Sequence, residues 1–134
     1  MNINELINKA IEARSKSYSP YSKFKVGASI LLKNGTYVLG CNVENVSYGL
    51  TNCAERTALF KLVSDGYNKD DVVAMAIVGD TLEPIAPCGA CRQVMLEILD
   101  KDTPIIMANL NGKYIETKVS SLVPYIFGGI ENAD

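Results

Sequence analysis

Two short cysteine segments contain most of the chemistry that this sequence suggests. The first is Cys53-Ala54-Glu55, and further along Cys88 and Cys91 form a Cys-x-x-Cys pair. Three thiolates can bind one zinc ion and leave its fourth tetrahedral position open for water, which is typical of catalytic rather than structural zinc sites. Glu55 follows the first cysteine closely enough to move protons to and from that water. The segments therefore predict hydrolysis by a metal-bound hydroxide.

The absence of histidine from the sequence narrows the possible mechanisms. Serine–histidine and cysteine–histidine nucleophilic schemes are excluded, and any zinc must be bound through sulfur or carboxylate. Three thiolates also give zinc an excess of negative charge, so a nearby cation is needed if the water is to ionise near neutral pH. Arg56 directly follows Glu55. We expect Arg56 to donate hydrogen bonds to one or two ligand sulfurs.

A Cys-x-x-Cys pair has two common alternative interpretations, a redox pair or half of a structural zinc site. A closed structural site would need a fourth ligand, and Cys41 is the only other cysteine in the chain. Cys41 lies on an apolar strand face, where a small buried thiol is the ordinary interpretation. A three-cysteine catalytic site is therefore favoured.

Length and composition are those of one globular domain spanning residues 1–134. The chain is 48% hydrophobic and 21% charged, and its net charge is -2. Without a basic cluster to neutralise phosphates, a nucleic-acid partner is not expected. No signal peptide is evident, and the longest apolar stretch, residues 72–78, falls far short of the roughly 18 residues that cross a bilayer. We expect a cytoplasmic protein without a membrane partner, in which cysteines stay reduced.

Hydrophobic periodicity predicts helices and strands in the order α-β-β-α-β-α-β-β-α. Helices are expected over residues 4–16, from 54 to about 65, from 88 to about 99, and over 120–125. Strands are expected over residues 26–32, 37–43, 71–79, 104–110 and 113–118. This order implies a mixed five-stranded sheet covered by helices, a three-layer α-β-α sandwich.

The predicted elements place all three cysteines at helix starts. Cys53 opens one helix, and Cys88 and Cys91 lie on the first turn of the next. The free backbone N–H groups and the positive dipole end at such positions favour thiolate over thiol.

Four segments of the chain resemble a known family. The pattern Cys-x-Glu followed by Pro-Cys-x-x-Cys resembles the zinc-dependent nucleobase deaminases. Residues 24–28, 42–45, 53–58 and 87–93 are similar to the small homotetrameric cytidine deaminases, and the similarity extends to about Phe127. The resemblance implies one Zn²⁺ per subunit and hydrolytic deamination of cytidine and deoxycytidine to uridine and deoxyuridine, with release of ammonia, in pyrimidine salvage.

The resemblance also implies roles for individual residues. Glu55 would shuttle protons while the zinc hydroxide attacks C4 of the pyrimidine. Phe24 would line the base pocket, the N–H of Ala54 would contact the base carbonyl, and Asn42 with Glu44 would bind the ribose 3′-hydroxyl.

The remaining implied residues lie at the edge of the site. Tyr48 and Phe127 match residues that reach a neighbouring subunit's site, so a homotetramer with shared active sites is expected. Arg56 and Gln93 are expected immediately behind the metal ligands.

Three other functions are compatible with the zinc pattern. A deaminase of a modified cytosine nucleoside, such as the blasticidin S type, is disfavoured by the ribose pair Asn42 and Glu44. A polynucleotide-editing deaminase is disfavoured by the acidic charge and by Cys53, where those enzymes commonly have histidine. A non-enzymatic zinc-binding module is the third alternative.

Overall fold

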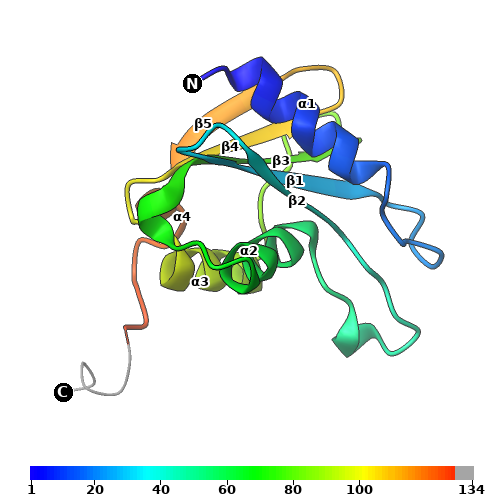
Figure 1. The fold of residues 1–134 in the computed structure, drawn as a ribbon. Helices are drawn as coiled ribbons and strands as arrows, with labels where there is room; N and C mark the ends of the chain where they lie inside the picture. Colours follow the sequence, from blue (N-terminus) through cyan, green and yellow to red (C-terminus); the bar gives the residue numbers. More distant parts are fainter. Residues whose placement is uncertain (129–134) are drawn as a thin grey trace.

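A mixed five-stranded sheet forms the centre of the computed structural model, which describes residues 1–128 (Figure 1). The strands are β1 (Val26–Leu32), β2 (Tyr37–Cys41), β3 (Val72–Gly79), β4 (Pro104–Asn109) and β5 (Tyr114–Lys118). They lie in the order β2-β1-β3-β4-β5, and of these neighbours β3 and β4 pair in parallel while the others are antiparallel. The mixed sheet predicted from the sequence is confirmed.

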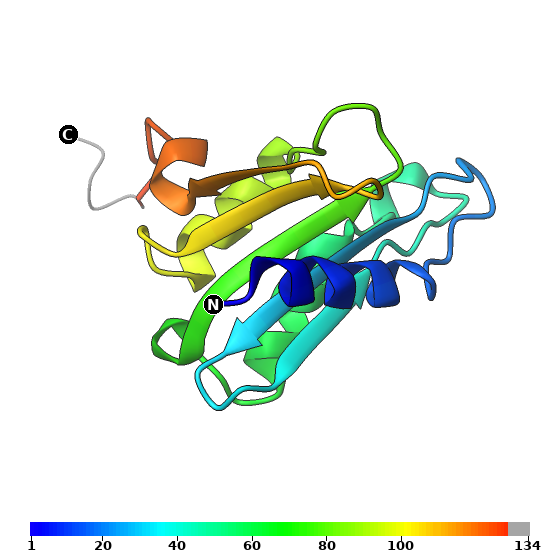
Figure 2. The ribbon, with the colours of Figure 1, turned by 90° about the horizontal axis from the view of Figure 1, so that it is seen from above.

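Helices cover both faces of this sheet. Helix α1 (Ile3–Arg14) lies along one face, and α2 (Ala54–Ser64) and α3 (Gly89–Ile98) lie side by side against the other (Figures 1 and 2). A short helix, α4 (Val119–Leu122), adjoins α3 and the end of β5. The arrangement is the expected three-layer α-β-α sandwich.

Side-chain size differs between the two faces of the sheet. The face toward α1 is built largely from small residues, among them Ala74, Ala76 and Ala108. The face toward α2 and α3 contains larger side chains, such as Met75 and Ile77. Small residues shorten the distance at which a helix can pack against the sheet, and the larger ones fill the space under two helices.

A close approach also fixes α2, the helix that begins after Cys53. A Cβ atom on Gly40 of β2 would lie 2.4 Å from the backbone nitrogen of Ala58 and 2.6 Å from the carbonyl oxygen of Ala54. The first two turns of α2 therefore rest directly on the backbone of β2, and only glycine leaves room for them.

Several predicted boundaries differ from the observed ones. Strand β2 ends at Cys41 rather than at residue 43, and its buried residues are Val38 and Gly40. Cys41 is only half-buried, because β2 is an edge strand of the sheet. The last helix spans Val119–Leu122 instead of residues 120–125. Short 3-10 turns at Tyr48–Leu50 and Lys69–Asp71 do not follow from hydrophobic periodicity.

Replacing Gly40 with alanine should destabilise the fold. The added methyl group would force α2 away from β2, and overpacking of this kind costs about 1–3 kcal/mol. Urea unfolding of Gly40→Ala measures the loss. Gly49→Ala is the matched control, because a Cβ there meets no atom within 4 Å. Equal unfolding free energies for the two variants would contradict the close packing of α2.

Candidate metal centre and adjoining cavity

The sulfur atoms of Cys53, Cys88 and Cys91 converge between the starts of α2 and α3. All three lie within 4.8 Å of one another, with 3.8 Å between Cys53 and Cys88 and 3.5 Å between Cys88 and Cys91. Sulfurs bound about 2.3 Å from one tetrahedral zinc would lie roughly 3.8 Å apart. The cluster therefore fits one zinc ion per subunit.

Cys41 does not belong to this cluster. Its thiol donates a hydrogen bond to the carbonyl oxygen of Lys16, 3.4 Å away, near the edge of the sheet. Within the described residues, the three-cysteine group is the one set of potential ligands close enough to hold a metal ion. A zinc ion bound by these three described sulfurs would keep its fourth coordination position for water.

The helix starts shape the electrostatics of the cluster. Cys53 is the N-cap of α2 and Cys88 the N-cap of α3, and neither side chain bonds to the N–H groups of its own helix. Cys91 lies in the first turn of α3 and is buried. The positive ends of two helix dipoles thus face three sulfurs, which stabilises negative charge there.

Cys53 loses its thiol proton more readily than Cys91. Hydrogen bonds from Cys91 and Arg56 lower the pKa of Cys53 to about 5, although partial burial opposes the change. The pKa of Cys91 is raised, because its thiol donates to the Cys53 sulfur and is itself buried. Binding of zinc would release the remaining thiol protons, as thiolates are the species that bind the metal.

Arg56 lies directly behind this thiolate. Its Nη2 donates a hydrogen bond to the Cys53 sulfur at 3.4 Å, and this contact raises the pKa of the guanidinium. The Nε of Arg56 is buried and has no hydrogen-bond partner among the described residues. An arginine held there despite an unpaired N–H supports the need for a positive charge beside the sulfurs.

Glu55 is almost fully enclosed next to the cluster. It lies in the first turn of α2 and is 5% exposed. Burial raises the pKa of its carboxyl, and the charge of Cys53 adds to the effect. A carboxyl in such a place can hold a proton at a pH where an exposed glutamate would not.

A cavity of about 280 Å³ adjoins the metal ligands. Seven residues singled out from the sequence line it, namely Phe24, Asn42, Glu44, Cys53, Ala54, Glu55 and Cys88. Six further lining residues were not expected from the sequence, namely Ser22, Val26, Thr51, Asn52, Ile85 and Ala86. Ile85 and Ala86 directly precede Pro87, so their position before the second cysteine segment was the available signal.

Asn42 and Glu44 form hydrogen bonds with the segment that leads into β1. Asn42 is buried, accepts a hydrogen bond from the N–H of Val26 at 2.9 Å and donates one to the carbonyl oxygen of Phe24 at 2.8 Å. Glu44 accepts hydrogen bonds from Ser22, and these lower the pKa of its carboxyl. One side of the cavity therefore keeps an amide and an ionised carboxylate in fixed positions.

Phe24 and Ile85 form the apolar walls. Both side chains pack over Gly79, where a Cβ would lie 3.0 Å from Ile85 and 3.2 Å from Phe24. The absence of a side chain at the end of β3 thus makes room for two flat or branched apolar groups at the cavity.

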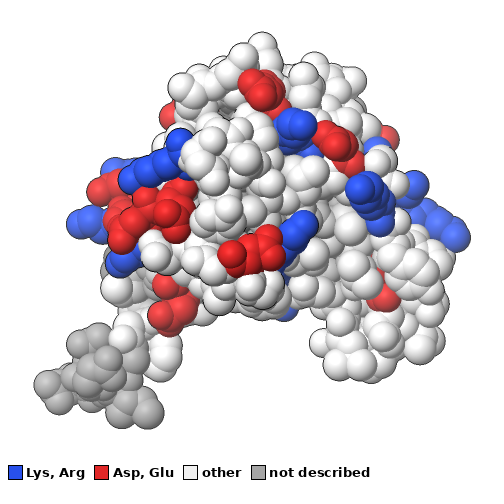
Figure 3. Space-filling view, in the orientation of Figure 1, with Lys and Arg blue, Asp and Glu red and all other residues white. Residues whose placement is uncertain are grey.

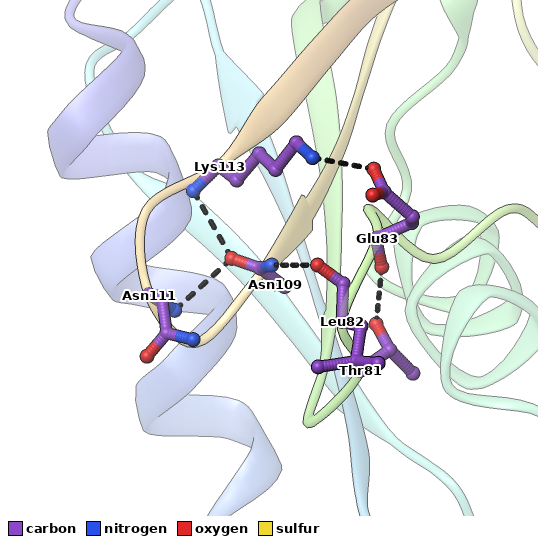
Figure 4. Close-up of polar contacts among 6 residues, drawn as sticks. All are labelled: Thr81, Leu82, Glu83, Asn109, Asn111 and Lys113. Carbon is purple, nitrogen blue, oxygen red and sulfur yellow. Dashed lines mark hydrogen bonds and ion pairs between the residues drawn. The ribbon is translucent and has the colours of Figure 1, made fainter.

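A polar network holds the loop that contains Ile85 and leads to Cys88. Asn109, buried at the end of β4, donates to the carbonyl oxygen of Leu82 at 3.0 Å (Figure 4). Its own oxygen accepts from the N–H groups of Asn111 and Lys113, and Lys113 forms an ion pair with Glu83 at 2.6 Å. The β4–β5 turn is therefore tied to the loop that supplies one wall and one metal ligand.

Three predicted residues lie away from this cavity. Tyr48 is 81% exposed and borders a neighbouring hollow with Tyr21 and Glu44. Phe127, 69% exposed, lines a separate hollow with Gln93. Gln93 is itself exposed and does not lie behind the ligands as expected, because two residues along a helix turn a side chain about 200° from the buried Cys91.

Charge on the described surface is mixed. Positive and negative side chains alternate over the face in Figure 3, and no basic stripe crosses it. No arginine or lysine lines the cavity. Within residues 1–128, none of the helices combines the length and the apolar character needed to span a membrane.

Zinc content should depend on the clustered cysteines and not on Cys41. Cys88→Ser should lose the metal, because two thiolates and a neutral hydroxyl bind zinc far more weakly than three thiolates. Cys41→Ser should keep one zinc per chain, as measured by inductively coupled plasma mass spectrometry. Loss of zinc from both variants, or from neither, would contradict the assigned ligand set.

The comparisons with known proteins agree with this geometry. Residues 1–107 match the family model of the cytidine and deoxycytidylate deaminase zinc-binding region. A cytidine deaminase of Halalkalibacterium halodurans is 56% identical over 122 residues, 91% of each chain, and one of Sporosarcina psychrophila is 49% identical over 95% of this chain and 92% of the relative. The crystal structure of cytidine deaminase from Burkholderia pseudomallei superposes with a TM-score of 0.92 at 49% identity, covering 95% of this chain and 100% of that one. The chain belongs to the cytidine and deoxycytidylate deaminase family.

Proposed function

We propose that the protein is a zinc-dependent cytidine deaminase of pyrimidine salvage. It would convert cytidine and deoxycytidine to uridine and deoxyuridine with release of ammonia. The observation that supports this most strongly is the placement of a buried carboxylate, Glu55, beside two of three clustered cysteines in one small cavity. Relatives named cytidine deaminase at 49% and 56% identity support the same activity.

The apolar part of the cavity suits a pyrimidine ring. Phe24 and Ile85 supply apolar surface on which a flat base can pack. Ala54, buried in the first turn of α2, has an N–H with no acceptor inside its helix, and this donor is available to the base carbonyl. These contacts would orient C4 toward the cysteine cluster.

The polar part of the cavity suits the sugar of a free nucleoside. Asn42 keeps one amide hydrogen and Glu44 keeps unshared electron pairs beyond the hydrogen bonds described above, so both can bind the ribose 3′-hydroxyl. Asn42 is buried and Glu44 is partly exposed, and a substrate without a hydroxyl would leave both groups without that hydrogen-bond partner, which disfavours it. Among the described residues no lysine or arginine lines the cavity, so this subunit offers a 5′-phosphate no cationic partner there, which disfavours nucleotides.

The chemistry divides between the metal and Glu55. Zinc held by Cys53, Cys88 and Cys91 would act as a Lewis acid that makes a water acidic enough to attack C4. Glu55 would accept a proton from the attacking water and donate it to N3 of the ring. It then passes the second proton of the water to the exocyclic amine, which leaves as ammonia, so the oxygen remains on C4. Arg56 offsets the negative charge of the thiolates during these steps.

The enzyme is proposed to work as a homotetramer with shared active sites. Tyr48 and Phe127 are large, apolar and largely exposed on the described subunit, and Tyr48 borders a hollow that shares Ser22 and Glu44 with the cavity. An aromatic side chain left in water at the rim of a pocket is a favourable contact for a second subunit.

Replacing Glu55 should separate metal binding from catalysis. Glu55→Gln keeps the size of the side chain and all three sulfurs but cannot carry a proton. We expect full zinc content and a fall in turnover of about 10²- to 10⁴-fold, the range typical of a lost acid–base group. Loss of absorbance as cytidine is consumed, measured with and without a chelator, reports the activity.

Glu12→Gln is the matched control for this experiment, because Glu12 is exposed on α1. Normal turnover of Glu55→Gln would eliminate the proposed proton transfer. Zinc-dependent turnover of a modified cytosine nucleoside but not of cytidine would point to a different deaminase, and no turnover of either would leave a zinc-binding module.

The proposed homotetramer can be tested by its mass in solution and by a substitution at Phe127. Sedimentation equilibrium should give four times the mass of one chain. Phe127→Ala should lower the turnover of cytidine but change the free energy of unfolding of a single subunit little, because the side chain is largely exposed on its own chain. A monomer with full activity would remove the roles of Tyr48 and Phe127 across subunits.

A further inference from the structure

We propose that Ser22 is a positioning residue for the sugar, which holds the Glu44 carboxylate in place and links it to the base wall at Phe24. The inference rests on the proposed function, because it takes Glu44 as the group that binds the ribose 3′-hydroxyl. Ser22 lines the same cavity as Glu44 and Phe24.

The carboxylate of Glu44 is held by one short segment of chain. Its Oε1 accepts hydrogen bonds from the N–H groups of Tyr21, at 3.0 Å, and Ser22, at 3.1 Å. Its Oε2 accepts a short hydrogen bond from the hydroxyl of Ser22. Both oxygens are therefore fixed, and the orientation of the carboxylate follows the position of this segment.

The same hydroxyl also faces the base wall. Ser22 Oγ accepts a hydrogen bond from the N–H of Phe24 at 3.0 Å. A hydroxyl can donate one hydrogen bond and accept others, and here it donates to the sugar carboxylate and accepts from the backbone of the base-lining residue. A movement of Glu44 would thus be transmitted to Phe24 through a single oxygen atom.

The turn that allows both contacts is strained. Lys23, between Ser22 and Phe24, has a φ of 61°, and it is the one non-glycine residue in the described chain with a positive φ. Its N–H donates to the carbonyl oxygen of Ser19 at 3.0 Å. A left-handed residue with a full side chain persists when surrounding contacts over-determine it, and the hydrogen bonds to Glu44 are such contacts.

The role of Ser22 can be separated from a general structural role by the choice of substrate. Deoxycytidine and 2′,3′-dideoxycytidine differ only in the 3′-hydroxyl. A residue that acts through Glu44 should matter more for the first substrate than for the second. A residue that only shapes the base pocket or the fold should affect both equally.

The experiment compares kcat/KM of four proteins, wild type, Ser22→Ala, Glu44→Gln and the double variant, on the two substrates. Ser22→Ala should lower kcat/KM for deoxycytidine about 5- to 20-fold, mainly by raising KM, as expected for a lost hydrogen bond to a charged group. The loss with dideoxycytidine should be clearly smaller, because only the hydrogen bond between the hydroxyl and the N–H of Phe24 then affects the bound substrate. The double variant should be no worse than Glu44→Gln, because the two residues act as one unit.

Ser22→Thr should restore activity, since it keeps the hydroxyl. Ser64→Ala, which removes an exposed hydroxyl bound to a carbonyl of α2, should change neither substrate. Zinc content and the unfolding midpoint are measured for every variant, and Ser22→Cys replaces Ser22→Ala if the latter fails to fold.

Equal losses of Ser22→Ala on both substrates, or an additive loss in the double variant, would overturn the role of Ser22 while leaving the ribose role of Glu44 intact. If Glu44→Gln shows no loss that depends on the 3′-hydroxyl, the proposed ribose contact fails and the inference fails with it. The single-variant results distinguish these two cases.

Discussion

The meeting of two helix N-termini at one point is the constraint on which the rest of the structure depends. Cys53 begins α2 and Cys88 begins α3, and their sulfurs must lie close enough to share an ion. This requires both helices on the same face of the sheet and side by side. The parallel pairing of β3 and β4 meets the requirement, because the crossover through α3 returns the chain to that face. Gly40 then allows α2 to settle onto β2.

Charge is the second condition that the site must satisfy. Three thiolates and a buried glutamate repel one another, and the two helix dipoles offset only part of this repulsion. Arg56 supplies a full positive charge at hydrogen-bonding distance from Cys53, while its own Nε has no hydrogen-bond partner among residues 1–128. Burial of these charged groups therefore costs stability that an apolar cluster of the same size would not.

Features with a local pattern could be predicted from the sequence. The ligands, Glu55 and the α-β-α layers follow from residue spacing, helix starts and periodicity, which depend on neighbours along the chain. The exposed position of Gln93 also follows from the helical period, although Gln93 was expected behind the metal ligands. The place of Ser22 in the cavity had no such signal, because it depends on segments brought together only by the tertiary fold, whereas Ile85 had one in its position just before Pro87. The short β2 and the half-buried Cys41 likewise reflect the edge of a sheet whose strand order no local pattern contains.

The sequence separation within the metal cluster has a consequence for folding. Cys53 and Cys88 are 35 residues apart, and the chain between them includes β3, the central strand. In the native structure the pairing of β3 with β1 and the crossover to α3 bring these sulfurs together, through contacts between distant parts of the chain. The geometry of the cysteine cluster is therefore a property of the whole sheet topology rather than of either cysteine segment, and metal binding at this cluster is coupled to folding.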